Sequence, residues 1–290
     1  MLRLGLHTRR RLTPWLFLGP GLLWLIVFFA IPLANQANVS LQSGDPETGY
    51  AFNWAFGTYS DAISEYSEQF TRSILYAAIA TIACFVIAFP LAYFIAFKSG
   101  RFKSLMLGLI ILPFFMSYVL RTVAWQLILS DNGWVVARFR DLGILSSDGR
   151  LLASSVAVIA GITYNFLPFM ALPLYVSLEK IDRRLIEAAT DLYASRATAF
   201  RRVTLPLAIP GIFAGSLLTF IPACGDFINA ALLGTPQQFM IGNVIQSKFL
   251  TVLDYPTAAA LSFILMTFIL VGIFLYARVL GSRTLTEAAV

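Results

Sequence analysis

The sequence predicts an all-α membrane protein with six transmembrane helices and both termini in the cytoplasm. Three observations predict this fold: an apolar composition, six long apolar segments, and basic residues confined to alternate loops. Of the 290 residues, 58% are hydrophobic and only 12% are charged, whereas soluble domains carry about 25% charged residues. Such a chain cannot cover a water-exposed surface with polar groups, so we expect lipid to be its solvent.

The first apolar segment follows a basic N-terminus. Residues 1–11 carry four arginines and no acid, and residues 15–33 are apolar and rich in Phe and Trp. A signal peptide has the same order of features, but its apolar core is only about 7–15 residues long. Because about 20 apolar residues span a bilayer, we expect an uncleaved first transmembrane helix, with a signal peptide as the alternative.

Five further apolar segments are separated by shorter loops. We expect them to cross the bilayer over residues 73–97, 105–129, 152–178, 207–231 and 256–280. Pro256 suits the first turn of the last one. No loop exceeds about 40 residues, which is below the size that usually folds alone. We therefore expect a single transmembrane domain over residues 1–290.

The charges of the loops predict the orientation of the spans. Residues 34–72 hold five acidic residues and one basic residue. The charged residues of 98–104 are all basic, and residues 179–206 hold six basic and four acidic residues. Lys and Arg collect in short cytoplasmic loops, so the N-terminus and the last two of these loops should lie inside. The same preference accounts for the net charge of +6, and we expect no nucleic-acid partner.

The cytoplasmic loop at residues 179–206 predicts two short helices. In the first, over residues 181–192, an acid is followed by two alanines, which form helices well and allow a partner to approach closely. Ser195 can cap the second helix, which should run through Phe200. Prolines at 206 and 210 should end that helix and turn the chain back into the membrane.

This loop resembles the EAA loop of permease subunits from ATP-binding-cassette importers. The matching residues keep a fixed spacing: Glu187, Ala188, Ala189, Asp191, Ala194, Ser195, Phe200, Leu205 and Pro206, followed by Pro210 and Gly211. The resemblance implies a type I importer permease fold and a cytoplasmic helical elbow that docks into a cleft on a separate ATPase subunit. Glu-Ala-Ala alone is a weak signal, since it recurs at residues 287–289, and an ordinary solvated linker is the alternative.

One position departs from that pattern. Where the family usually has glycine, this chain has Tyr193. A non-glycine residue in a left-handed turn costs about 1–2 kcal/mol. Either the turn is not left-handed here, or packing of the Tyr193 ring offsets the cost.

Two apolar segments resemble spermidine/putrescine-type permeases. The stretch at residues 112–125 includes Leu-Pro-Phe-Phe, and the stretch at residues 219–234 includes Phe-Ile-Pro-Ala-Cys-Gly-Asp-Phe. The resemblance implies a polyamine substrate, although related members carry other small solutes.

An acid in the fifth span is a candidate for binding such a substrate. Asp226 lies in an otherwise apolar segment, where a charge is costly and functional by default. Pro222 and Gly225 precede it and should kink or unwind the helix, as is tolerated where a helix lines a cavity. A carboxylate on such a break could pair with an ammonium group.

Aromatic residues on the third and fourth spans could complete the site. Tyr118, Arg121 and Trp125 share one helix face by their spacing, and Tyr164 and Asn165 lie on the next span. Aromatic rings attract cations by about 0.5–2 kcal/mol each. We therefore expect Asp226 and these rings to line a cavity for a flexible polycation.

Three alternatives remain for these residues. Asp226 could pair with Arg121 as a structural bridge. Tyr118 and Trp125 could belong to an aromatic belt at the outer interface, and Tyr164 could only fill space. A free Arg121 would instead favour an anionic or zwitterionic solute such as an aminophosphonate.

The sequence offers no catalytic, metal or cofactor site. It lacks a Gly-x-x-x-x-Gly-Lys-Ser/Thr loop, so this chain should not hydrolyse ATP. The lone His7 and two cysteines, Cys84 and Cys224, predict no metal site or disulfide. A secondary transporter would need ion-coordinating polar clusters, and a membrane enzyme a nucleophile or metal set, which the sequence does not show.

The resemblance implies several partners in the bacterial cytoplasmic membrane. They are a second homologous permease subunit, two copies of a cytoplasmic ATPase, and an extracytoplasmic solute-binding protein.

Overall fold

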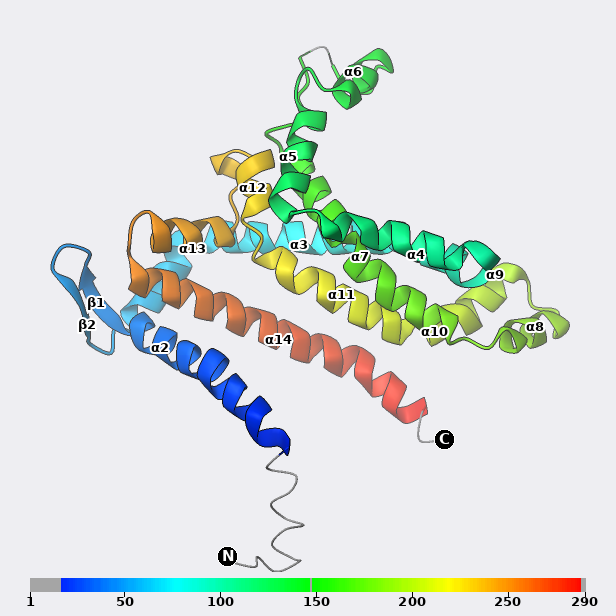
Figure 1. The fold of residues 1–290 in the computed structure, drawn as a ribbon, viewed down its shortest axis with the longest axis horizontal. Coiled ribbons are helices and arrows are strands. Elements are labelled where there is room, and N and C mark those ends of the chain that lie inside the picture. The colour runs from blue at the N-terminus through cyan, green and yellow to red at the C-terminus, as the bar shows by residue number, and fades with distance from the viewer. Residues whose placement is uncertain (1–16, 147, 288–290) are drawn as a thin grey trace, which may run out of the picture. The chain divides into compact units, whose positions relative to one another are not determined.

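The computed structural model describes residues 17–146 and 148–287, with side chains up to Arg278. Its regular structure is helical except for one short hairpin, β1 (Gln42–Asp45) and β2 (Gly49–Phe52), in this part of the chain (Figure 1). The basic residues 1–11, the first two residues of the first expected span and the repeat at 288–289 lie outside the described residues.

The chain divides into two compact units. The first contains the described residues up to Ser64 together with Ser247–Ile264, and the second contains Glu65–Gln246 and the described residues from Leu265 on. The expected all-α fold is confirmed, and the β-hairpin is the addition that the polar loop at residues 34–72 did not predict.

The first described element of the first unit is the apolar helix Phe17–Ser40. No part of its most apolar stretch is buried. It contains a π-helical turn, η1 (Ile26–Ala30), followed by α2 (Ile31–Ser40). Asp45 forms the hairpin turn, where its carboxylate accepts the backbone N–H of Thr48 at 2.8 Å. That hydrogen bond holds the pKa of Asp45 below its usual value.

Four helices of the described chain are each long and apolar enough to cross a membrane. They are Phe17–Ser40, α3 (Gly57–Phe97), α7 (Ser155–Glu179) and α14 (Tyr255–Glu287). Two bent helix pairs, Gly100–Phe115 with Tyr118–Asp141 and Arg196–Leu207 with Ile209–Cys224, raise the number of candidate spans in the described chain to as many as six. The first pair covers the third expected span, and the second half of the other pair covers most of the fifth.

The bend in the third expected span is the larger of the two. The stretch Gly100–Phe115, which includes η2 (Gly100–Phe102), α4 (Lys103–Ile111) and η3 (Leu112–Phe115), meets Tyr118–Asp141 at 95°. The second stretch holds α5 (Tyr118–Leu129) and α6 (Trp134–Asp141). Pro113 interrupts the α-helical hydrogen bonds and Met116 is extended, so the helix is broken within the third expected span, residues 105–129.

The second unit is built around two closely packed helices, α7 and α11 (Ile209–Cys224), which lie side by side in Figure 1. Gly211 and Gly215 lie four residues apart on α11, as in helix pairs that approach closely in membranes. A Cβ at Gly211 would lie 2.4 Å from the Ser177 Cβ, and one at Gly215 would lie 2.8 Å from the Met170 sulfur. Only glycine therefore fits at these two positions.

Replacing Gly211 with alanine should destabilise the fold by about 1–3 kcal/mol, because the added methyl group overpacks the α7–α11 contact. Thermal unfolding of the purified chain in detergent measures the effect. Gly108→Ala on α4 is the matched control, since nothing lies within 4 Å of its added Cβ. Equal melting temperatures for the two variants would contradict this packing argument.

Two hydrogen bonds join α3 to α7, and the two helices run in the same direction. The Tyr76 hydroxyl donates to the Ser155 Oγ at 2.5 Å, and the Cys84 thiol donates to the Thr163 carbonyl at 3.3 Å. Both pairs are separated by 79 residues, so the two helices advance in register. Cys84 and Cys224 are free and buried.

Candidate functional site

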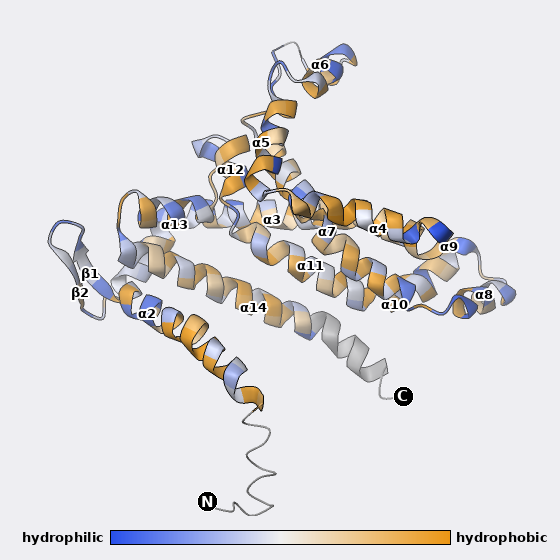
Figure 2. Cartoon of the chain, in the orientation of Figure 1, coloured by the Kyte–Doolittle hydropathy of each residue, from blue (hydrophilic) through white to orange (hydrophobic). Residues whose placement is uncertain are grey.

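The expected cytoplasmic elbow is formed by four consecutive helical segments, which we call the elbow (residues 183–207). They are α8 (Arg183–Asp191), α9 (Arg196–Ala199), the π-helical η4 (Phe200–Thr204) and α10 (Leu205–Leu207). Figure 2 shows mainly hydrophilic residues on α8 and α9, in contrast to the apolar helices α7 and α11.

Side-chain caps explain where the helices of the elbow begin. The Asp182 carboxylate accepts the backbone N–H of Arg184 at 3.0 Å, and the Ser195 Oγ accepts that of Thr198 at 3.2 Å. The chain bends by 61° between Leu207 and Ile209. The bend therefore lies between Pro206 and Pro210, which both occupy the first turn of a helix and end neither.

The turn between α8 and α9 is left-handed at Tyr193, with a φ of 58°. The Tyr193 side chain is 99% exposed, so its ring packs against nothing in the described chain. The strain that the sequence predicted for a left-handed turn is thus present and is not offset within this subunit. Leu192 is also 82% exposed, which gives the turn an apolar and aromatic tip beside the exposed Glu187 and Ala188.

Asp226 lies in a break between two helices of the second unit. Helix α11 contains Pro222 and ends at Cys224, with Gly225 as its C-cap, and α12 (Ile228–Leu233) begins three residues later. The Asp226 Oδ1 accepts the backbone N–H groups of Ile228 and Asn229 at 2.9 and 3.0 Å. The backbone of the break is held by Asn243, whose Nδ2 donates to the Phe227 carbonyl at 2.8 Å.

The other oxygen of Asp226 belongs to a buried polar network. Its Oδ2 accepts the Tyr118 hydroxyl at 2.5 Å and the Asn229 Nδ2 at 2.6 Å. The Asn229 Oδ1 accepts from the Thr122 hydroxyl and the Asn165 Nδ2, each at 3.3 Å. This network joins α5, α7 and α12, and Asp226 is only 6% exposed.

Arg121 lies beside this network but makes no ion pair with Asp226 in the described residues. Its guanidinium carbon is 5.3 Å from the Phe114 ring centroid and 5.6 Å from that of Tyr118. The side chain is 6% exposed, and its Nε and Nη1 have no hydrogen-bond partner in the described part of the chain. Arg121 is thus a buried cation held by aromatic faces.

The remaining candidate residues form a separate contact. The rings of Trp125 and Tyr164 meet edge to face with centroids 5.4 Å apart. Tyr164 also lines an apolar groove with Pro113 and Leu167. The structure therefore joins Tyr118, Asn165 and Asp226 through Asn229, and places Trp125 against Tyr164.

Residues 73–283 match the family described as the inner membrane component of binding-protein-dependent transport systems. The chain belongs to this family. It is a non-catalytic membrane subunit, a permease, of an ATP-binding-cassette importer, as its elbow sequence predicted.

Two relatives and one solved structure extend this result. The permease is 39% identical to the spermidine/putrescine transport system permease protein PotB of Haemophilus influenzae over 88% of this chain and 90% of PotB. It is 36% identical to PotB of Escherichia coli over 91% of this chain and 96% of PotB. A chain of a bacterial importer of the acidic polysaccharide alginate has the same fold, with a TM-score of 0.69, 18% identity and coverage of 94% and 96%.

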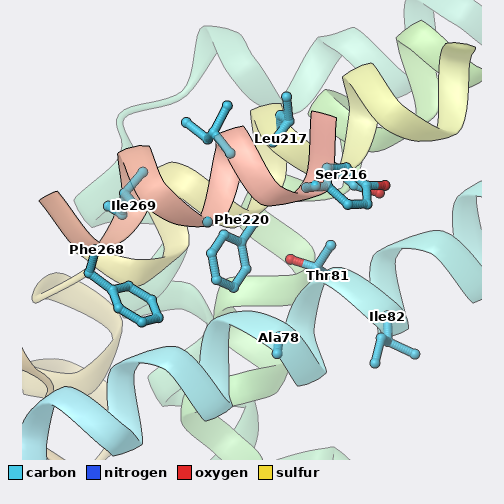
Figure 3. A pocket seen from close by; sticks show the side chains of 11 residues that line it. Ala78, Thr81, Ile82, Ser216, Leu217, Phe220, Phe268 and Ile269 are labelled. Atoms are coloured by element: carbon cyan, nitrogen blue, oxygen red, sulfur yellow. The ribbon is translucent and has the colours of Figure 1, made fainter. Parts of the chain in front are cut away.

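The permease also has an apolar groove of about 370 Å³ between α3, α11 and α14. Figure 3 shows Ala78, Thr81, Phe220 and Phe268 around it. Its lining carries no charged side chain, and the Thr81 hydroxyl already donates to the Ala77 carbonyl. The groove therefore suits apolar groups rather than a polar solute.

The sequence reasoning missed Asn229 and Thr122 of the permease, which connect the candidate residues. Both are fully buried. A signal for Asn229 was present, because an amide three residues after Asp226 in an apolar segment needs a polar partner. Thr122 had no such signal, since threonine is common in apolar helices.

Proposed function

We propose that this permease carries polyamines such as spermidine and putrescine. The observation that carries this proposal is the similarity to the two PotB permeases along most of both chains. The buried carboxylate of Asp226 and the Tyr118 ring beside it supply the chemistry that an ammonium group needs.

In this proposal the Asp226 network is the resting state of the solute site. The Tyr118 hydroxyl and the Asn229 amide are neutral donors to the Asp226 Oδ2. A substrate ammonium would replace them, because a charge-assisted hydrogen bond is stronger than a neutral one. The break at residues 225–227 would allow that exchange without disturbing the helices on either side.

The proposed assembly contains a second homologous permease, two ATPase copies and an extracytoplasmic solute-binding protein. Six spans, with the third and fifth bent, would form the transmembrane domain, and the loop at residues 179–206 would be the coupling loop. Closure of the ATPase dimer on ATP would tilt the elbow and open the path between the permeases outward. After hydrolysis the path would return inward and release the solute.

Tyr193 tests the docking surface of the elbow. Tyr193→Gly should raise the free energy of unfolding by at most about 1 kcal/mol, because relief of the left-handed strain exceeds the entropic cost of glycine. It should also weaken ATPase association about fivefold, since exposed aromatic rings often anchor interfaces. Thermal unfolding and a binding titration measure the two effects.

Tyr193→Ala is the control that separates the effect of the backbone strain from the effect of the aromatic ring. It keeps a side chain in the left-handed turn and removes the ring, so association should weaken without any gain in stability. An unchanged affinity in both variants would show that the ring does not touch the ATPase.

The experiment that tests the proposed solute is reconstitution of the importer in proteoliposomes. Spermidine and putrescine should stimulate ATP hydrolysis in the presence of the solute-binding protein and should be taken up. The permease alone should hydrolyse no ATP. Stimulation by an aminophosphonate and not by either polyamine would overturn the polyamine proposal.

A second candidate is an anionic or zwitterionic solute, and one observation favours it. The Nε and Nη1 atoms of the buried Arg121 have no partner in the described chain, and the oxygens of an anionic solute would supply the missing hydrogen-bond acceptors. In that case Arg121→Gln should abolish uptake of an aminophosphonate, whereas a polyamine carrier should tolerate this variant.

A further inference from the structure

The elbow contacts the cytoplasmic end of α3, a helix to which it is not adjacent in sequence. The Arg183 Nη2 donates to the carbonyls of Ala96 and Phe97 at 3.2 and 3.3 Å. The same guanidinium lies 5.8 Å from the Phe97 ring centroid. Arg183 is the first residue of α8, so the N-terminal end of the elbow is fixed to the last turn of α3.

This contact suits the end of a helix. The last carbonyls of an α-helix have no partner within the helix, and the negative end of its dipole attracts a cation. Arg183 supplies both the donors and the charge. The side chain of the neighbouring Arg184 makes no hydrogen bond or ion pair in the described residues, and its backbone N–H donates to the Asp182 carboxylate. The two arginines therefore differ although they are adjacent.

A second contact joins the other half of the elbow to the same helix. The Phe200 ring meets Phe89 and Tyr93 of α3 edge to face, with centroids 5.7 and 6.0 Å apart. Phe89 and Tyr93 lie one turn apart on α3, so Phe200 packs across one face of that helix. The two contacts therefore hold α3 at two positions along its length. One comes from the elbow segment before the exposed turn at Tyr193, and the other from the segment after it.

Helix α3 is in turn fixed to α7, which leads directly into the elbow. The bonds from Tyr76 to Ser155 and from Cys84 to Thr163 join the two helices farther from the elbow. Helix α11, which follows the elbow, packs closely on α7 at Gly211 and Gly215. A force on the elbow therefore reaches α7 and α11 through the chain. It reaches α3 directly through Arg183 and Phe200, and indirectly through the bonds between α7 and α3.

We propose that Arg183 and Phe200 are positioning residues that make α3 move with the elbow, so that α3, α7 and α11 tilt as one body during transport. This inference rests on the proposed docking of the elbow on an ATPase. Without these contacts the ATPase would still bind and hydrolyse ATP, but part of the movement would be lost before it reached α3.

Arg183→Gln tests the coupling in the reconstituted importer. The variant should hydrolyse ATP within about twofold of wild type but transport about tenfold fewer spermidine molecules per ATP. Arg184→Gln loses the same charge one residue away and should couple normally. Arg183→Lys keeps a cationic donor and should recover most of the coupling. Equal transport per ATP in the Arg183→Gln and Arg184→Gln variants would overturn the proposal.

A distance measurement tests the same inference without a solute. Spin labels on cysteines at Phe94 of α3 and Arg202 of the elbow should give one narrow distance, unchanged after trapping with ATP and vanadate. In the Arg183→Gln background that distance should shift or broaden on trapping. An unaltered distribution in this background overturns the inference.

The two experiments separate this inference from the proposed function. A wild-type importer that takes up no spermidine contradicts the proposed solute, while the label distance still decides the movement of α3. An ATPase that does not bind the wild-type elbow contradicts the docking itself.

Discussion

Replacing Ala188 with tryptophan should abolish transport by the assembled importer while the permease still folds. Ala188 is exposed on α8, next to Glu187 and one turn before the exposed Leu192. A large side chain at a docked surface overpacks it at a cost of about 1–3 kcal/mol, which weakens association by about ten- to a hundredfold. Binding of the ATPase and uptake of spermidine both measure this loss.

Two controls show whether the loss of transport arises from lost docking or from misfolding of the permease. Ala188→Ser adds one atom and should keep both association and uptake, whereas a fold that depends on this position would suffer in both variants. The melting temperature of the permease alone should be the same for the Ala188→Trp and Ala188→Ser variants, since Ala188 faces solvent in this subunit. Normal uptake by the tryptophan variant would show that α8 does not dock at Ala188.

The sequence predicted the parts of the fold that depend on local composition. Apolar segments predicted the four described helices that are long and apolar enough to cross a membrane. Ser195 begins the second helix of the elbow, as its capping side chain predicts. The family followed from the spacing of residues along the elbow, because that spacing is set by one continuous stretch of chain.

The sequence did not predict features that depend on backbone geometry between elements. The 95° bend before Tyr118 arises from an extended Met116 after a 3₁₀ turn, and Pro113 alone predicts a kink without its size. At Tyr193 the sequence left two conformations open, and only the φ of 58° distinguishes them.

Long-range polar contacts were the hardest to predict. Asp226 was a candidate as an acid in an apolar segment, but its partners Tyr118 and Asn229 lie on two other elements, α5 and α12. Arg183 gave no signal at all, since an arginine in a cytoplasmic loop is expected to be solvated. Its bonds to the end of α3 depend on how two distant helices are packed.

Replacing Asp226 with asparagine should reduce polyamine uptake at least about tenfold while the importer still assembles. The variant removes the only negative charge of the described network around Asn229, and an ammonium without a carboxylate partner in an apolar site loses more than about 1.4 kcal/mol. The amide group would also face the donors Tyr118 and Asn229 with its own N–H, which costs about 1–3 kcal/mol of stability. Uptake kinetics and thermal unfolding separate the two effects.

Asn229→Ala is the variant that distinguishes substrate binding from structure. It removes one donor to the Asp226 Oδ2 and the acceptor for Thr122 and Asn165, but it keeps the charge. If Asp226 binds the ammonium, Asp226→Asn should raise the KM for spermidine far more than Asn229→Ala does at equal loss of stability. If Asp226 only holds the break between α11 and α12, both variants should lower stability and uptake together and leave KM unchanged. The ratio of the two KM values therefore decides whether the carboxylate acts on the solute or on the helix.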